Sequence, residues 1–165
     1  MAVTKAIKAI AKTLLANIKN YGGKRNLKSI KYIVIHYTAN DGDKAINNAK
    51  FFHNNVVKAS AHYFVDDDSW IKSVPLHNIA WSVGGKKYSN CAKYSGGGKF
   101  YGICTNANSI NIEMCDTVKN GKIYPTQATI NNTIALTRKL MKQCNVDKNH
   151  VIRHFDVTGK TCPAY

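Results

Sequence analysis

Tyr32-Ile33-Val34-Ile35-His36 is typical of a buried β-strand that ends on an imidazole, because its apolar run is short, unbroken and rich in β-branched residues. Most other segments show either alternation or helical spacing of apolar residues, whereas residues 75–108 are poor in period. The other expected elements are strands over 61–66, 69–74, 110–114 and 150–152, and helices over 43–54 and 126–144. Strands that alternate with helices predict an α/β fold, here a single domain with a central mixed β-sheet flanked by helices.

Short polar side chains mark the ends of several of these elements. Asp43 and Thr126 stand where a helix N-cap accepts backbone N–H groups. Asp66-Asp67-Asp68 lies between the two strands of a tight antiparallel hairpin and lacks the downstream ligands of a calcium loop. We therefore expect the acidic triplet to be a solvated turn.

The first residues of the chain combine isoleucines with lysines. Over 4–19 the apolar residues fall on one face of a helix and the lysines mostly on the other. A basic amphipathic helix is predicted here, which either packs on the core or touches an anionic membrane or wall surface. The scattered lysines do not form the pattern of a secretory signal.

The chain is strongly basic, with 24 Lys and Arg against nine Asp and Glu, and a formal net charge of +15 in 165 residues. Such a charge indicates a polyanionic partner: nucleic acid, anionic lipid or the phosphate-rich polymers of a Gram-positive wall. We find no helix-turn-helix signature, RNP pattern or paired-Cys finger, so no nucleic-acid partner is expected. The alternative is that the lysines only keep the protein soluble.

Three residues far apart in the sequence could form a metal site. His154 and Cys162 are eight residues apart, with Gly159 between them to let the chain turn back, and His36 ends the first strand. Two imidazoles and a thiolate suit zinc, and three protein ligands leave a fourth position for water, which points to metal-assisted hydrolysis. Spacing alone leaves the alternative open that these are a strand terminus, a surface histidine and a buried thiol.

The five cysteines do not form the framework of a disulfide-rich domain. Cys91 and Cys104 flank a glycine-rich loop and could approach one another. Cys115 and Cys144 lie on apolar-patterned segments and are expected to be buried free thiols.

Five short motifs appear together in a fixed order. They are IVIHYT at 33–38, SAHYFV at 60–65, AWSVG at 80–84, NSINIE at 108–113, and HFD with KTCP within 154–163. In this order the motifs resemble those of zinc-dependent N-acetylmuramoyl-L-alanine amidases, the family that includes amidase-2 endolysins, T7 lysozyme and the peptidoglycan recognition proteins. The resemblance covers residues 30–165 and leaves out residues 1–20.

The resemblance implies a set of site residues. It makes His36, His154 and Cys162 the zinc ligands, and Lys160 the cation beside the scissile carbonyl. Many members carry a catalytic glutamate at the place of Glu113. Other members use a tyrosine just before the hairpin histidine, but this chain has Ala61 there. Glu113 is therefore the expected catalytic carboxylate, and Tyr63, on the same strand face as Ala61, is a second candidate.

Other residues near these motifs are candidates for binding substrate or supporting the ligands. His62, Tyr63, His77 and Trp81 are candidate substrate contacts, although His62 and Trp81 could equally be core residues. Asp156 could orient His154 or its loop through a hydrogen bond.

The resemblance also implies an activity and a setting. The chain is expected to cleave the amide between N-acetylmuramic acid and L-alanine of peptidoglycan by zinc-activated water, as the catalytic domain of a phage or prophage endolysin. It would be made in the host cytoplasm without a signal peptide and reach the wall through a holin pore or from outside. Residues 1–22 would form the basic helix and loop, able to touch anionic wall polymers or membrane, and 23–165 the catalytic domain. The alternative is a non-catalytic peptidoglycan-binding module, which Cys162 argues against because such modules typically lose this ligand.

Overall fold

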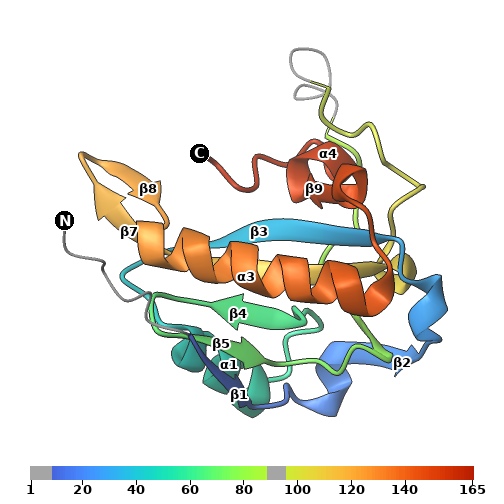
Figure 1. Ribbon diagram of the computed structural model, residues 1–165, viewed down its shortest axis with the longest axis horizontal. Coiled ribbons are helices and arrows are strands. Elements are labelled where there is room, and N and C mark those ends of the chain that lie inside the picture. The colour runs from blue at the N-terminus through green and yellow to red at the C-terminus, as the bar shows by residue number, and fades with distance from the viewer. Residues whose placement is uncertain (1–8, 89–95) are drawn as a thin grey trace.

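The computed structural model describes residues 9–88 and 96–165, which form strands, helices and short 3-10 turns (Figure 1). The strands are β1 Ile10–Thr13, β2 Tyr21–Lys24, β3 Tyr32–Asp41, β4 Tyr63–Val65, β5 Ser69–Lys72, β6 Asn78–Ala80, β7 Ser109–Lys119, β8 Lys122–Tyr124 and β9 Val151–Arg153. The helices are α1 Ala45–Asn54, α3 Gln127–Cys144 and α4 His154–Thr158. Of these helices, none has both the length and the apolarity that a bilayer crossing requires.

A mixed sheet forms the centre of the domain, as predicted. Its strands follow the order β1-β5-β4-β7-β3-β9, and β8 extends it by pairing with β7. β3 lies between β7 and β9 and runs parallel to both, whereas β4 and β5 form the predicted antiparallel hairpin. Outside this sheet, β2 and β6 pair with each other.

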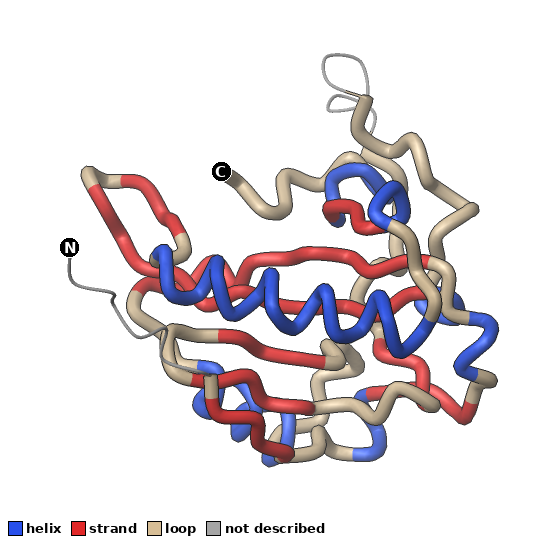
Figure 2. The backbone as a smooth tube through the Cα atoms, viewed as in Figure 1, coloured by secondary structure: helices blue, strands red, loops and turns tan. Residues whose placement is uncertain are grey.

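The two faces of the sheet are covered by different helices, so alternate residues of each strand meet different surroundings. α3 lies across one face (Figures 1 and 2), where Leu136 and Leu140 pack with Ile33 and Ile112 in the main core. On the other face α1 packs near Phe64, and Val34 packs with Cys104 from the segment between β6 and β7 and with Val157 of α4. By strand alternation, His36 of β3 and Glu113 of β7 lie on this second face.

The N-terminal helix prediction is wrong where the structure can test it. Ile10–Thr13 form β1, which pairs in parallel with β5, and Ile18–Asn20 form a 3-10 turn. The open edge of β5 supplies backbone hydrogen bonds that outweigh the weak local preference of a short lysine-rich segment. Residues 10–13 therefore belong to the same sheet as the rest of the domain, and residues 1–8 lie outside the described part.

The predicted caps and turn have mixed outcomes. Thr126 caps α3 as expected, accepting from the N–H of Thr129 at 3.1 Å. Asp43 does not cap α1: its carboxylate accepts from the N–H of Asp116 at 3.0 Å, and the first helical N–H, of Ala45, donates to Asp66 instead. Asp66 is buried, so the prediction of a solvated turn is wrong for this residue.

The described cysteines are reduced and buried. Cys104, Cys115, Cys144 and Cys162 are free thiols, which confirms the expectation for Cys115 and Cys144. Cys91 lies outside the described residues.

Candidate metal centre

The pairing of β9 with β3 brings the two predicted histidine ligands together. Ile35 is in register with Arg153, so the next residues, His36 within β3 and His154 at the start of α4, lie side by side. β3 continues to Asp41, so the expectation that His36 ends the strand is wrong. The C-terminal loop after α4 adds Cys162. The ligand atoms of the three residues all lie within 4.8 Å of one another, and the residues are only 2–5% exposed.

The geometry and protonation of this cluster fit a metal ion. Cys162 Sγ lies 3.8 Å from His36 Nδ1, and a tetrahedral zinc ion would separate such a pair by about 3.5 Å. Burial lowers the pKa of His36 to about 3 and that of His154 to about 4, so both imidazoles are neutral, as metal ligands must be. Burial raises the pKa of the Cys162 thiol to about 12, so a bound cation is what would hold it as a thiolate.

Glu113 stands beside the three ligands, and one of its carboxylate oxygens has no hydrogen-bond partner among the described residues. It pairs in register with His36, and its Oε1 lies 3.9 Å from His36 Nδ1. Oε2 is buried, and no group within the described residues bonds to it. Burial raises the pKa of this carboxyl to about 8, although Lys160 opposes the shift. A buried carboxyl with an unbonded oxygen beside candidate metal ligands is typical of a proton-transfer group.

Lys160 supplies the positive charge at this site. It is exposed on the loop between α4 and Cys162, and its charge lowers the pKa of both His154 and Glu113. The predicted ligands, the predicted carboxylate and the predicted cation therefore meet at one place on the surface.

The cluster lies in a cleft with two connected parts. One part, of about 700 Å³, contains the metal ligands, Glu113 and residues of α1, including Asn47 and Phe51. The other, of about 450 Å³, is lined by Trp81 together with several lysines. Both parts share Ser82, His154 and Lys160, so the groove passes over the ligands.

The four candidate substrate contacts differ in whether the structure places them in the cleft. Trp81 lines the second part of the cleft, as its prediction requires. His62 is fully buried and Tyr63 is buried in the core under α3, so the predictions that they contact substrate are wrong. His77 is exposed, but the cleft as the described residues define it does not include it.

Asp156 acts on the loop of His154. Its carboxylate accepts from the Arg153 N–H at 2.8 Å and from the Arg153 guanidinium at 2.7 Å. These bonds cap the first turn of α4 and fix the point at which His154 leaves β9.

Comparison with known proteins identifies the family of the chain. The sequence profile of the family described as N-acetylmuramoyl-L-alanine amidase (Amidase_2) matches residues 26–165. The chain belongs to this amidase family. It is 33% identical over 143 residues to the amidase CwlL of Bacillus licheniformis and 35% identical over 144 residues to the amidase BlyA of Bacillus subtilis, in each case over 84% of this chain. The chain spans only 37% of the length of either relative.

Solved structures of similar fold include domains of the same family. A mutant endolysin from Bacillus subtilis superposes with a TM-score of 0.72 and 26% identity over 94% of this chain and 90% of that one. The catalytic domain of XlyA gives a TM-score of 0.71 and 25% identity, over 94% and 91%. The mixed sheet with its open groove is therefore the fold of these amidase domains.

Sequence reasoning missed two polar residues of this amidase domain, the buried Asn111 and the half-buried Arg25. Asn111 bonds to the ring of His36 at 3.0 Å, and Arg25 bonds to backbone carbonyls that include those of Leu76 and Ser109. A signal for Asn111 was present, because it alternates with Ile110 and Ile112 in a buried strand where an unpaired amide would be costly. For Arg25 the sequence offered no comparable signal.

Proposed function

We propose that this domain hydrolyses the amide between N-acetylmuramic acid and L-alanine in bacterial peptidoglycan. The observation that carries the proposal is the unpartnered carboxyl of Glu113 beside the three clustered ligands, at the floor of an open groove. Membership of the amidase family supports the choice of an amide as the bond that is cleaved.

His36 Nδ1, Cys162 Sγ and the His154 ring would hold a zinc ion. The bound ion supplies Lewis acidity, which acidifies water and polarises a carbonyl oxygen. Glu113 accepts a proton from the attacking water, and its raised pKa suits it to pass that proton on to the leaving amide nitrogen. The ammonium group of Lys160 neutralises the charge that develops on the carbonyl oxygen. The products are the sugar lactyl carboxylate and a free L-alanine amine.

The two-part groove suits a substrate that extends on both sides of the scissile bond. Peptidoglycan carries a sugar chain on one side of this bond and a peptide on the other. Trp81 offers an aromatic face for one of them in the second part of the groove. Its role in substrate binding stays a prediction.

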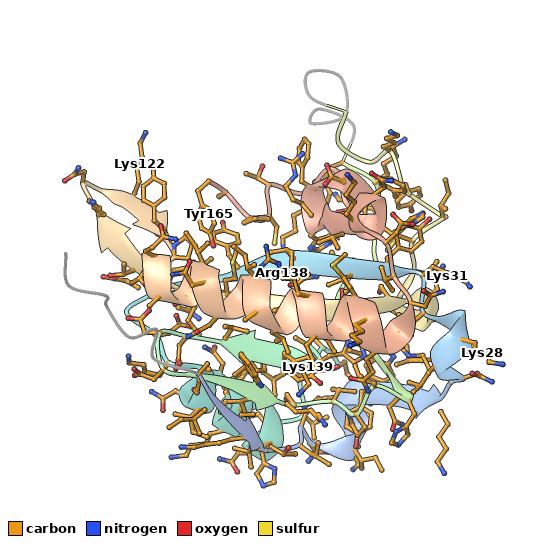
Figure 3. All side chains as sticks on the ribbon, in the orientation of Figure 1. Lys28, Lys31, Lys122, Arg138, Lys139 and Tyr165 are labelled. Atoms are coloured by element: carbon orange, nitrogen blue, oxygen red, sulfur yellow. The ribbon has the colours of Figure 1, made fainter. Side chains whose placement is uncertain are left out.

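The net charge of +15 supports a second contact with the wall. Basic side chains extend into solvent from separate elements, among them Lys28, Lys31, Lys122 and Lys139 (Figure 3). We propose that this charge draws the domain to anionic wall polymers, with anionic membrane lipid as the weaker alternative. The relatives that are endolysins support a route from the host cytoplasm through a membrane pore, which also stays a proposal.

An assay on purified sacculi tests the activity. The chain is incubated with Gram-positive sacculi, with and without a zinc chelator, and free N-terminal alanine and reducing sugar are measured. New alanine amines that disappear with chelator support the amidase. Reducing ends would indicate a glycosidase, and binding without any product would indicate a non-catalytic module; either result contradicts the proposal.

A further inference from the structure

We propose that Asn111 is a positioning residue that holds His36 in the Nε2–H form, so that Nδ1 is free to bind the metal. The inference rests on the metal-dependent function proposed above. It concerns a residue of the chain that lies one strand away from the ligand cluster and contributes no ligand atom.

The contact itself fixes the proton on the ring. Asn111 Oδ1 lies 3.0 Å from His36 Nε2, and both residues are buried. An amide oxygen only accepts, so Nε2 must carry the hydrogen, and a neutral imidazole then has its lone pair on Nδ1. Nδ1 is also the atom that faces Cys162 Sγ at 3.8 Å and Glu113 Oε1 at 3.9 Å.

The orientation of the Asn111 amide is set by its other end. Asn111 Nδ2 donates to Ser109 Oγ at 3.2 Å, and the Ser109 hydroxyl in turn donates to the Thr105 carbonyl at 2.7 Å. Because the hydroxyl hydrogen is already used, Ser109 Oγ faces the amide as an acceptor. The NH₂ group therefore points to Ser109 and the oxygen to His36.

The backbone of Asn111 is held in place by His62. The N–H of Asn111 donates to His62 Nδ1 at 3.0 Å, and the N–H of His62 donates to the Asn111 carbonyl at 3.0 Å. Burial and the neighbouring Arg25 lower the pKa of His62 to about 3, so its ring stays neutral. His62 thus fixes the backbone position of Asn111 through two hydrogen bonds.

A purely structural role for Asn111 predicts a different outcome. A satisfied buried amide contributes to stability, but its loss would leave the tautomer of His36 and the metal affinity unchanged. Asn132, on α3, provides the matched control. It is also buried, and its Nδ2 donates to the carbonyls of Asp66 and Asp67 at 2.9 and 2.8 Å. Asn132→Ala should therefore lower stability without affecting the metal.

The test compares Asn111→Ala, Asn111→Asp and Asn132→Ala in the full chain. Zinc affinity is measured by competition with a chromophoric chelator, and the tautomer of His36 by long-range ¹H–¹⁵N NMR. We expect Asn111→Ala to bind zinc about 10–100-fold more weakly and to lose the single Nε2–H form. Asn111→Asp keeps the acceptor and should restore both properties, whereas Asn132→Ala should leave both as in the unchanged chain.

Two results would overturn the inference. One is an Asn111→Ala chain that binds zinc as tightly as the unchanged chain with the same His36 tautomer. The other is an Nδ1–H form of His36 in the unchanged, zinc-free chain, a measurement that does not depend on how well any variant folds. Neither readout needs turnover, so a chain that binds zinc but does not cleave peptidoglycan would contradict the proposed function and leave this inference standing.

Discussion

At the scale of one residue, Glu113 shows how burying a carboxyl without a full set of partners costs stability. Its side chain is 22% exposed, yet Oε2 is buried without a partner, and its pKa is raised to about 8. The folded state therefore prefers the protonated carboxyl, whereas an unfolded chain ionises it at about 4.3. Between these two values folding binds a proton, so the free energy of unfolding falls as the pH rises.

Glu113→Gln should remove this pH dependence in zinc-free protein. At pH 7.5 we expect the variant to be about 4 kcal/mol more stable than the unchanged chain, because its amide has no charge to bury. Near pH 4 the two chains should have similar stability. Urea denaturation in the presence of chelator, at both pH values, measures the difference; an equal gap at the two pH values would contradict the assigned pKa shift.

The same variant tests the proton transfer. Glu113→Gln keeps the size of the side chain but cannot accept a proton, so turnover on sacculi should fall by about 10²–10⁴-fold. The three zinc ligands are unchanged, so the zinc content should stay near that of the unchanged chain. Full activity with bound zinc would remove Glu113 from the mechanism.

Lys160 can be tested by a change that keeps its length. Lys160→Met removes the charge from the groove, and we expect kcat to fall by about 10²-fold, while Lys160→Arg retains part of the activity. Lys31→Met, at an exposed lysine, is the control for loss of one positive charge (Figure 3). Equal kcat values for the Lys160→Met and Lys31→Met chains would show that Lys160 acts only through net charge.

Asp66 connects several elements, which makes the hairpin turn a structural joint. Its carboxylate accepts from the N–H of Ala45 at the start of α1 and from the N–H of Ser69 at the start of β5, at 2.9 and 2.8 Å. Its carbonyl accepts from Asn132 of α3. A turn that looks solvated in the sequence thus joins both helical layers to the sheet.

Asp66→Ala should destabilise the domain by about 3 kcal/mol, because it leaves buried N–H groups without an acceptor. Asp68→Ala is the matched control at a side chain that is 75% exposed, and it should change stability by less than about 0.5 kcal/mol. Urea denaturation of the two variants measures the difference. Similar losses in both would show that Asp66 does not join the elements as described.

At the scale of elements, sequence analysis succeeded best where local signals determine an element, and it failed where an element depends on residues far apart in the sequence. β3 and α3 were predicted because apolar spacing and the Thr126 cap are local signals. β1 was predicted as a helix because its partner, the edge of β5, is far away in the sequence. The candidate metal ligands were predicted from ordered motifs, whereas the bond from Asn111 to His36 depends on strand register, which no local pattern encodes.

For the whole molecule, the dominant property is the excess of positive charge. The 24 Lys and Arg residues are not gathered into the N-terminal segment: Lys28, Lys31, Lys122 and Lys139 extend from different elements (Figure 3). The proposed attraction to a polyanion would therefore come from the domain surface and would not require a basic N-terminal helix. Salt screens such attraction, and the Debye screening length is about 8 Å at physiological ionic strength.

Binding to whole walls should therefore depend on salt, while the chemistry should not. We expect the Glu113→Gln chain to bind sacculi that carry anionic polymers roughly tenfold more weakly at 0.5 M than at 0.05 M NaCl in a sedimentation assay. Binding to sacculi stripped of these polymers should depend much less on salt, because the negative charge that attracts the lysines has been removed from the wall. Cleavage of a small soluble muropeptide by the unchanged chain should vary little over the same range, since that substrate meets only the groove. Equal salt dependence on intact and stripped walls would show that the charge of the domain does not recognise the wall polymers.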